Sequence, residues 1–218
     1  MWCLEIDQRP LQKALNNSIF RETWSQYVLE ILDSINQKGS WSTSKTKVKV
    51  LWGDARKKLM LVPKKIKFDL IFHDAFSPIK CPQLWTEEFI KNLADKLSPN
   101  GRIITYCSSA AVRGSLKSAG LELQSIIPVH NKKERWSSGT IAIQPSLCKG
   151  PTNSSKYSKP LSPREETHLL TSAAIPYRDP KGIDSPQAII KRRASEQQKC
   201  NLPSSSSWKK YWEKTQSS

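Results

Sequence analysis

The sequence predicts an α/β protein with a mostly parallel sheet that ends in an antiparallel strand. Over residues 1–146, short apolar runs alternate with helical patterns, as in a parallel sheet covered by helices on both faces. The last two predicted strands have no helix between them, so we expect them to pair antiparallel. Residues 147–218 lack this alternation and hold seven of the 14 prolines, which favours a basic, extended arm over a second domain.

The individual elements follow from apolar spacing and from the residues that end each run. One helix is predicted over 21–36 because its apolar residues share a face: Trp24, Tyr27, Val28, Ile31, Leu32 and Ile35. Further helices are expected at 86–97 and 110–119, and strands at 2–7, 48–52, 68–73, 102–107, 121–127 and 140–143. The run 68–73 is too short and too apolar for a surface helix, which predicts a buried parallel strand. Residues 38–47 are expected to be a polar loop and Pro99–Gly101 a turn.

Charge and composition limit the possible functions. The 218 residues include 35 Lys and Arg against 19 Asp and Glu, a net charge of +16, and both parts of the chain are basic. This balance indicates a polyanionic partner such as nucleic acid, although a solvated basic face is the alternative. There is no apolar run long enough to span a membrane, and the acidic start does not resemble a secretory signal. Five widely spaced cysteines without a CxxC pair predict a reduced, cytoplasmic protein with no metal site.

Carboxylates follow three of the predicted strands. Glu5 and Asp7 end the first, Asp54 follows the second, and Asp74 follows the third. In an open parallel sheet, ligands bind beyond the carboxyl ends of the strands, where a carboxylate can accept from ribose hydroxyls or an adenine amino group. A single acid there more often caps a helix or solvates a turn. Three of them on one rim favour a ligand site.

A more specific segment follows the third of these strands. Asp74 precedes Phe76, Ser77 and Pro78, and Trp85 follows after a short interval. The proline favours an extended backbone at the serine before it. The sequence therefore places a carboxylate and two aromatic rings in one region, and Tyr106 ends the next strand at the same rim. The alternative is an ordinary loop whose aromatic side chains pack on the core.

Other patterns carry less information. The three histidines show neither metal spacing nor a hydrolase arrangement, and a GxxxxGK[ST] phosphate loop is absent. Near the end of the chain, aromatic residues alternate with lysines: Trp208, Lys209, Lys210, Tyr211, Trp212 and Lys214. Such a segment can stack on bases and hold phosphates. Its aromatic residues can equally dock the tail on the core, which we favour because they share a helical face.

Taken in order, these segments resemble the MnmC-like methyltransferase family. The matching segments are Leu4-Glu5-Ile6-Asp7, Gly53-Asp54-Ala55, the block from Phe68 to Pro78, Leu84-Trp85-Thr86, Gly101 to Tyr106, Val112-Arg113 and Ala119-Gly120-Leu121. The resemblance covers roughly residues 1–145. It implies a Rossmann-like class I methyltransferase sheet and S-adenosylmethionine as cofactor. The tail, with Pro176–Pro180 and Lys191–Arg193, resembles the extension of stand-alone cyanobacterial members.

The resemblance also implies a reaction and residue roles. In the family's bifunctional bacterial enzyme, this domain methylates the aminomethyl group of the tRNA wobble uridine. Glu5 would hold the cofactor ribose, Asp54 would face the adenine, and Asp7 and Ala55 would also bind the cofactor. Asp74, at the junction of methyl donor and acceptor amine, would bind the cofactor and act in catalysis. The substrate would contact seven further side chains, the last two of them in the basic loop before the final strand: Phe76, Ser77, Pro78, Trp85, Tyr106, Lys133 and Arg135. A separate oxidase would act upstream, because the flavin-dependent half of the bifunctional enzyme has no counterpart here.

One departure from the family pattern concerns the first strand. The family's first strand and its Gly-rich turn are expected before Trp2, and the given sequence supplies neither. This predicts a gap in the sheet between strands 2–7 and 68–73, and it favours a start codon placed too late or a decayed gene. Two alternative functions remain at this point: a non-catalytic RNA-binding paralogue, and an aminopropyltransferase-like enzyme. The DAFSP and LWT segments and the positive charge disfavour the second.

Overall fold

The computed structural model describes residues 1–128, 138–145 and 156–215. These residues divide into two compact units, Met1–Pro63 and Lys64–Ser218. The boundary between compact units therefore lies after Pro63, whereas the compositional change in the sequence lies near residue 146. Lys133 and Arg135, which the sequence suggests as substrate contacts, lie outside the described residues.

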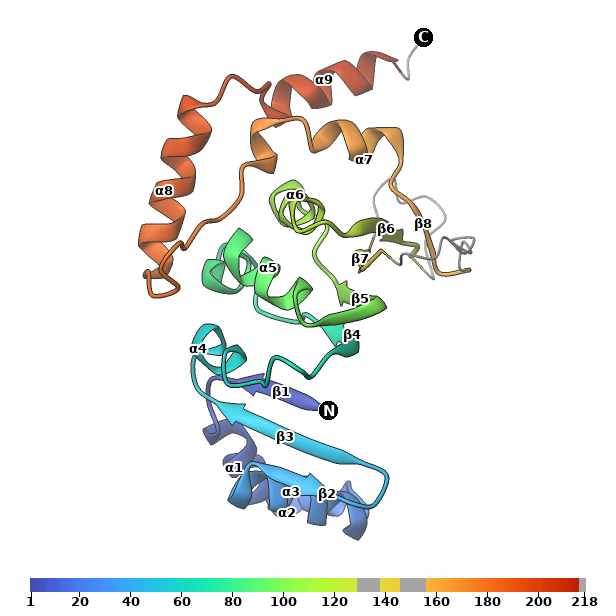
Figure 1. Ribbon diagram of the computed structural model, residues 1–218, viewed down its shortest axis with the longest axis vertical. Helices are drawn as coiled ribbons and strands as arrows, with labels where there is room; N and C mark the ends of the chain where they lie inside the picture. The colour runs from blue at the N-terminus through green and yellow to red at the C-terminus, as the bar shows by residue number, and fades with distance from the viewer. Residues whose placement is uncertain (129–137, 146–155, 216–218) are drawn as a thin grey trace. The chain divides into compact units, whose positions relative to one another are not determined.

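The first unit is a three-stranded sheet with helices beside it (Figure 1). Its strands, in spatial order, are β1 (Trp2–Glu5), β3 (Lys47–Trp52) and β2 (Ser40–Ser42). β1 and β3 pair in parallel, and β2 adds an antiparallel edge. The helices are α1 (Arg9–Leu15), α2 (Ser18–Glu22), α3 (Gln26–Lys38) and α4 (Ala55–Leu59). α3 contacts β2, and α4 contacts β1 and β3.

Two sequence predictions for this unit are wrong. The single helix expected over 21–36 is divided into α2 and α3, because Ser25 is extended and its side chain caps α3 by accepting from the Val28 N–H. Trp24 therefore lies outside both helices and is 47% exposed. The polar loop expected at 38–47 contains β2, whose pairing with β3 compensates for its weak apolar pattern.

The second unit is built on a five-stranded sheet. In spatial order its strands are β4 (Phe68–Phe72), β5 (Leu97–Thr105), β7 (Thr140–Ile143), β6 (Glu122–Ile126) and β8 (Ser158–Pro160). β4 and β5 are parallel, and the predicted antiparallel pairing of the last two strands is confirmed by β6 and β7. The expected turn at Pro99–Gly101 lies inside β5, where pairing with β4 shifts register and Asn100 has a φ of 64°.

Helices form two layers beside this sheet (Figure 1). The inner layer is α5 (Glu87–Ala94) and α6 (Ala110–Ser118), which contact each other and the strands. Thr86 caps α5, and Gly120, with a φ of +86°, follows the end of α6, as predicted. The outer layer comes from the C-terminal segment: α7 (Pro163–His168), α8 (Pro186–Lys199) and α9 (Ser205–Thr215). Two 3₁₀ turns, η1 (Pro82–Leu84) and η2 (Ser172–Ala174), contact α8 and α6 respectively.

The strand expected to be buried, β4, is an edge strand. It pairs only with β5 among the described residues, as β1 pairs only with β3, so no strand pairing joins the two sheets. Leu70 and Phe72 are 44% and 71% exposed, so the prediction of a buried strand is wrong. Apolar sequence indicates that a strand can be covered on both faces, but it does not provide the neighbour that covers it.

The C-terminal segment is tied to the second unit by strand pairing and by a buried ion pair. β8 pairs antiparallel with β6. Arg113 of α6 and Glu165 of α7 are almost fully buried, and their charged groups lie 2.9 Å apart. Ser125 donates to the same Glu165 oxygen, and Arg113 also donates to Thr140. These contacts make α7 an integral part of the unit.

Within the described ranges, no helix is both long and apolar enough to cross a membrane. The same residues contain no group of three or more His, Cys, Asp or Glu side chains arranged to hold a metal ion.

Candidate functional site

In the first unit, the carboxyl ends of β1 and β3 lie side by side. Glu5 is the register partner of Trp52, and the Gly53 N–H donates to the Glu5 carbonyl at 2.8 Å. This places Glu5, Asp7 and Asp54 at one edge of the same sheet, as the sequence predicts. Their main-chain geometry matches the position where parallel sheets bind ligands.

The three carboxylates differ in what they already bind. Asp7 forms an ion pair with Arg9 at 2.7 Å, and hydrogen bonds from this guanidinium lower the pKa of Asp7. One oxygen of Glu5 accepts from the N–H groups of Ile6 and Asp7. Its second oxygen has no hydrogen bond within the described part of the chain, and the side chain is exposed. Glu5 therefore retains an acceptor that suits a ribose hydroxyl.

Asp54 caps α4 and also binds the next arginine along the helix. Its side chain accepts from the Arg56 N–H and pairs with the Arg56 guanidinium at 2.7 Å. Partial burial acts to raise the pKa of Asp54, but the hydrogen bonds from Arg56 hold it below its usual value. Ala55, the first residue of α4, has no polar side chain to offer. Asp54 thus remains ionised, and an adenine amino group would have to share it with Arg56.

In the second unit, the loop after β4 presents a carboxylate and an aromatic ring to solvent. Asp74 is exposed and has no hydrogen bond or ion pair among the described residues. Phe76 is 77% exposed, although its chain neighbours Ser77 and Pro78 are half-buried. An exposed phenyl ring beside an uncommitted carboxylate can hold a flat, amine-bearing ligand by stacking and by hydrogen bonding.

Two aromatic side chains support this loop through its backbone. The Trp85 indole is fully buried, and its Nε1–H donates to the Phe76 carbonyl at 2.6 Å. The Tyr106 hydroxyl donates to the adjacent Ala75 carbonyl at 2.7 Å, and the two rings meet edge to face at 6.0 Å. Burial, with the nearby Cys107, Asp74 and Cys81, raises the pKa of Tyr106, so its hydroxyl stays a donor. The sequence suggested that Trp85 contacts the substrate directly. In the structure its indole is buried, and it supports the loop by binding the Phe76 carbonyl.

His73, which precedes Asp74, fixes the end of β4. Its Nε2 lies 2.9 Å from the Leu84 carbonyl, and its ring packs 4.3 Å from that of Trp85. Burial lowers the pKa of His73 to about 4, against smaller opposing effects of the Leu84 carbonyl and Asp74. The imidazole is therefore neutral at pH 7, and we assign it a structural part. The segment Leu84-Trp85-Thr86 connects β4, the Asp74 loop and α5.

The C-terminal segment supports the same region from outside, which sequence reasoning missed. Tyr177 forms an isolated parallel β-bridge with Thr86, and the Tyr177 carbonyl accepts from the Glu87 N–H at 2.9 Å. The Asp179 N–H donates to Glu88, while the buried Asp179 carboxylate accepts from two N–H groups of the next turn. The segment Pro176–Pro180 is thus accounted for by packing on the start of α5. The prolines and the tyrosine of this segment were the only signal in the sequence, and they do not indicate which element the segment packs against.

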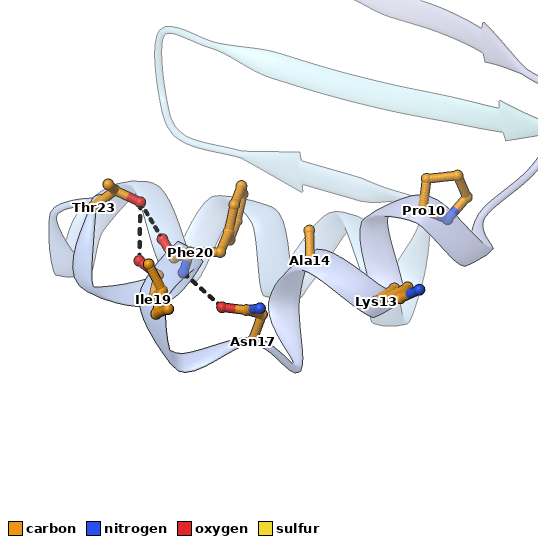
Figure 2. A pocket seen from close by; sticks show the side chains of 7 residues that line it. All are labelled: Pro10, Lys13, Ala14, Asn17, Ile19, Phe20 and Thr23. Atoms are coloured by element: carbon orange, nitrogen blue, oxygen red, sulfur yellow. Dashed lines mark hydrogen bonds between the residues drawn. The ribbon is translucent and has the colours of Figure 1, made fainter.

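Two surface grooves lie away from these residues. One, of about 570 Å³, lies between α1 and α2 and is lined by Pro10, Lys13, Ala14, Asn17, Ile19, Phe20 and Thr23 (Figure 2). The side chains of Asn17 and Thr23 are hydrogen-bonded to the backbone of α2, as the dashed lines in Figure 2 show. Among the residues that line this groove, only Lys13 is charged. The other lies between α6 and α7, where Lys117 pairs with Glu166. Neither groove contains a predicted site residue.

Comparison with known proteins gives the family. Residues 16–140, more than half of the chain, match the model of a family described as S-adenosyl-L-methionine-dependent methyltransferases. The chain belongs to this family. Membership implies S-adenosylmethionine as cofactor. The matched range includes Asp54, Asp74, Trp85 and Tyr106, but it begins after Glu5 and Asp7.

Individual relatives are consistent with this assignment. The chain is 29% identical over 135 residues to the tRNA 5-methylaminomethyl-2-thiouridine biosynthesis bifunctional protein MnmC of Pseudomonas savastanoi, covering 59% of this chain and 20% of that protein. It is 35% identical over 81 residues to an uncharacterised protein of Methanocaldococcus jannaschii, covering 37% and 22%. The chain thus spans about a fifth of the length of these relatives. The crystal structure of MnmC2 from Aquifex aeolicus aligns with a TM-score of 0.67 and 26% identity, over 92% of this chain and 68% of that one. This similarity supports the Rossmann-like methyltransferase fold and an MnmC-type methyltransferase.

Proposed function

We propose that this methyltransferase N-methylates the aminomethyl group of a modified wobble uridine in tRNA. The observation that carries the proposal is the loop after β4, where Tyr106 and Trp85 hold two consecutive carbonyls and leave Asp74 and Phe76 exposed. The printed name of the bacterial relative, which concerns 5-methylaminomethyl-2-thiouridine in tRNA, supports the choice of acceptor. The net charge of +16 suits an RNA substrate.

On this proposal, the first unit holds the cofactor. The free oxygen of Glu5 would accept from the ribose hydroxyls, and Asp54 would accept from the adenine amino group beside Ala55. Asp7, held in an ion pair by Arg9, would bind the cofactor at the same rim. When bound, S-adenosylmethionine supplies an electrophilic methyl group on a sulfonium centre.

The second unit holds the acceptor. An alkylamine has a pKa near that of lysine, about 10.4, so it is mostly protonated at pH 7 and must lose a proton before its nitrogen can attack. Asp74 would orient the amine and accept that proton, and Phe76 would stack on the uracil ring. Ser77 and Pro78 would shape the slot beside the ring. Support of the loop by Trp85 and Tyr106 would hold Asp74 and Phe76 in place for the acceptor.

The test measures the rate of methyl transfer by the variant Asp74→Asn. We expect the rate to fall by roughly 100-fold or more, since general-base assistance is worth 10²–10⁴-fold. The substrate is tRNA that carries 5-aminomethyl uridine derivatives, and the product is detected by mass spectrometry of the digested nucleosides. Calorimetry with S-adenosylmethionine measures whether the variant still binds the cofactor, so that a loss of rate at saturating cofactor is assigned to the methyl-transfer step.

The matched control is Asp95→Asn, which removes an exposed carboxylate at the end of α5 in the same unit. It should leave the rate unchanged. A rate for Asp74→Asn close to that of the wild type would exclude Asp74 as the proton acceptor. Failure of the wild-type chain to methylate this tRNA, with the cofactor bound, would exclude the proposed acceptor.

A further inference from the structure

The three-stranded sheet of the first unit has one covered side. Register partners in neighbouring strands point to the same side of a sheet. Val48 and Val50 of β3 are buried, and Trp41, the register partner of Val48, contacts Tyr27 of α3 with ring centroids 5.8 Å apart. α3 therefore packs on the side of the sheet that carries these residues.

The opposite side of the sheet, which we call the open face, carries lysines and serines. Lys47 and Lys49 alternate with the buried valines along β3, and both are exposed. Their antiparallel partners, Ser42 and Ser40, are exposed as well. Trp2 of β1 is the parallel partner of Lys49, whose Nζ lies 5.1 Å from the centre of the Trp2 ring. The open face consists of these five residues.

The hairpin that joins β2 to β3 gives this face an ordered backbone (Figure 1). In its turn, the Thr43 N–H donates to the Thr46 carbonyl at 2.7 Å, and the Thr43 hydroxyl accepts from the N–H groups of Lys45 and Thr46. The Trp2 ring also attracts the Lys49 ammonium group. A ligand would therefore meet a surface that is ordered in advance, which lowers the entropic cost of binding.

The positive charge of the open face is not neutralised by neighbouring acids. Glu5, the one acid in the three strands, is the register partner of Trp52 and so belongs to the covered side. Neither Lys47 nor Lys49 has an acidic partner within the described ranges. Ion pairs of this unit join other residues: Asp7 with Arg9, Asp33 with Arg21, and Asp54 with Arg56. The two lysines therefore keep their charge available to a polyanion.

The basic and aromatic segment at the end of the chain is engaged differently. The Trp208 and Trp212 indoles of α9 both donate to the Thr167 hydroxyl of α7, at 3.0 and 3.1 Å. This confirms the docking that we favoured from the sequence. The open face is therefore the better candidate for a nucleic-acid contact.

We propose that the open face binds the phosphate backbone of the tRNA substrate, with Lys47 and Lys49 contacting phosphates and Ser40 and Ser42 donating hydrogen bonds to them. Lysine binds phosphate as a point charge, and serine hydroxyls are common donors to phosphate oxygens. The two lysines lie about 7 Å apart along β3, at about 3.3 Å per residue, so each can reach a different phosphate. They lie in the first half of β3, away from the carboxyl end that Asp54 follows. This inference deepens the proposed function and rests on its choice of an RNA substrate.

The experiment measures fluorescence anisotropy of a labelled full-length tRNA transcript, titrated with the full chain at several KCl concentrations. Lys47→Thr/Lys49→Thr removes both charges and keeps residues that favour strands. We expect the slope of log affinity against log salt to fall in magnitude by about 1.5, because each lost phosphate contact removes about 0.7–0.9. Over a tenfold range of KCl, that change of slope corresponds to a roughly 30-fold change in relative affinity.

A second variant changes the charge of the open face and leaves both lysines in place. Ser40→Glu/Ser42→Glu puts a carboxylate opposite each lysine, where a cross-strand ion pair favours the sheet. This variant should stay folded and show the same reduced salt dependence, because the lysines are then paired with the new acids. Thermal unfolding followed by circular dichroism checks that both variants keep the wild-type fold.

A matched control separates the open face from general positive charge. Lys13→Ala/Lys38→Ala removes two exposed lysines from α1 and α3 of the same unit, and it should bind tRNA like the wild type. Equal effects of the two lysine pairs, or wild-type binding by Lys47→Thr/Lys49→Thr, would overturn the open face as an RNA contact and leave the proposed methyl transfer intact.

Further outcomes distinguish this inference from the proposed function. A wild-type chain that binds cofactor but no tRNA would overturn both. Binding of tRNA through the open face without methylation would support this inference and overturn only the proposed reaction. Binding to phosphatidylglycerol vesicles that Lys47→Thr/Lys49→Thr abolishes, with tRNA binding retained, would assign the face to an anionic membrane and overturn the RNA contact.

Discussion

At the scale of single residues, Arg113 is a buried charge whose partners are all supplied by the fold. It is 1% exposed, and it donates to Glu165, Thr140, Ser125 and the Gly139 carbonyl. Removing one member of such a pair leaves the other charge buried and unpaired. The resulting loss of stability is far larger than the net stabilisation that the intact pair provides after the cost of removing both charges from water. The ion pair therefore makes the attachment of α7 to α6 depend strongly on either residue.

We predict that Arg113→Met lowers the free energy of unfolding by about 3–5 kcal/mol. Lys117→Met provides a close comparison, because Lys117 and Glu166 join the same two helices at the same 2.9 Å separation but are exposed. Exposed pairs contribute about 0–1 kcal/mol, so this variant should unfold almost like the wild type. Urea denaturation followed by circular dichroism measures both. Similar losses in the two variants would show that burial does not decide the effect.

His73 gives a prediction about pH. Burial, the largest effect, lowers its pKa to about 4 from the ordinary 6.5, so the unfolded chain binds the proton more tightly than the folded one. Stability is therefore unaffected above about pH 6.5 and is lost as the pH falls from 6.5 toward 4, by an amount on the order of 3 kcal/mol.

Below that window, a further loss follows from Glu165. Burial acts to raise its pKa, but hydrogen bonds from Ser125, Ser162 and Arg113 lower it to about 2.

The variant that isolates the first window is His73→Gln, whose side-chain amide replaces the imidazole donor without titrating. Urea midpoints of wild type and variant should converge as the pH falls from 7 to 5. If the wild type keeps its full advantage at pH 5, the imidazole is not held neutral by the fold.

At the scale of elements, local sequence predicted strands better than it predicted their surroundings. β3, β6 and β7 lie close to their expected positions, because β-branched and apolar residues are dense there. The division between α2 and α3 was missed because the apolar period continues through Trp24, and a serine cap without Gly or Pro gives a weak signal. β2 was missed because its three residues derive their conformation from pairing with β3.

The candidate site shows the same limit. Spacing along the chain indicated that Asp74, Trp85 and Tyr106 gather at one rim, and contacts within the second unit confirm that the loop and both rings meet. Spacing could not show which side chains face solvent. The indole of Trp85 is buried because its N–H finds a backbone carbonyl inside, whereas Phe76 next to that carbonyl is exposed. Orientation depends on long-range packing, which a single sequence does not display.

The exposed edge of β4 leads to a prediction about association. Edge strands with large apolar side chains tend to pair with other chains, and Phe72 is 71% exposed on such an edge. We expect Phe72→Thr to lower the weight-average mass of the protein at high concentration, measured by sedimentation. Ile183→Thr removes an apolar side chain of similar exposure, 66%, from a loop, and it should change nothing. Equal masses for wild type and Phe72→Thr would argue against association through this edge.

At the scale of the whole molecule, composition and topology divide the chain differently. The proline-rich, basic segment after residue 146 differs in composition, yet β8 pairs with β6, Tyr177 binds the start of α5, and Glu165 binds Arg113. All three contacts join residues far apart in sequence, so no local pattern reveals them. The boundary after Pro63 coincides instead with the place where strand pairing stops.

Each unit has its own buried side chains, which predicts two unfolding transitions. Leu29 is 6% exposed in the first unit, and Ile103 is 1% exposed in the second. Truncating either to alanine costs roughly 2–5 kcal/mol. Such a loss lowers the midpoint by roughly 8 °C or more in a unit of the size of the first and by roughly 4 °C or more in a unit of the size of the second. By scanning calorimetry, Leu29→Ala should lower one midpoint and Ile103→Ala the other. If both variants lower a single shared transition by similar amounts, the two units unfold as one, and the boundary after Pro63 has no thermodynamic meaning.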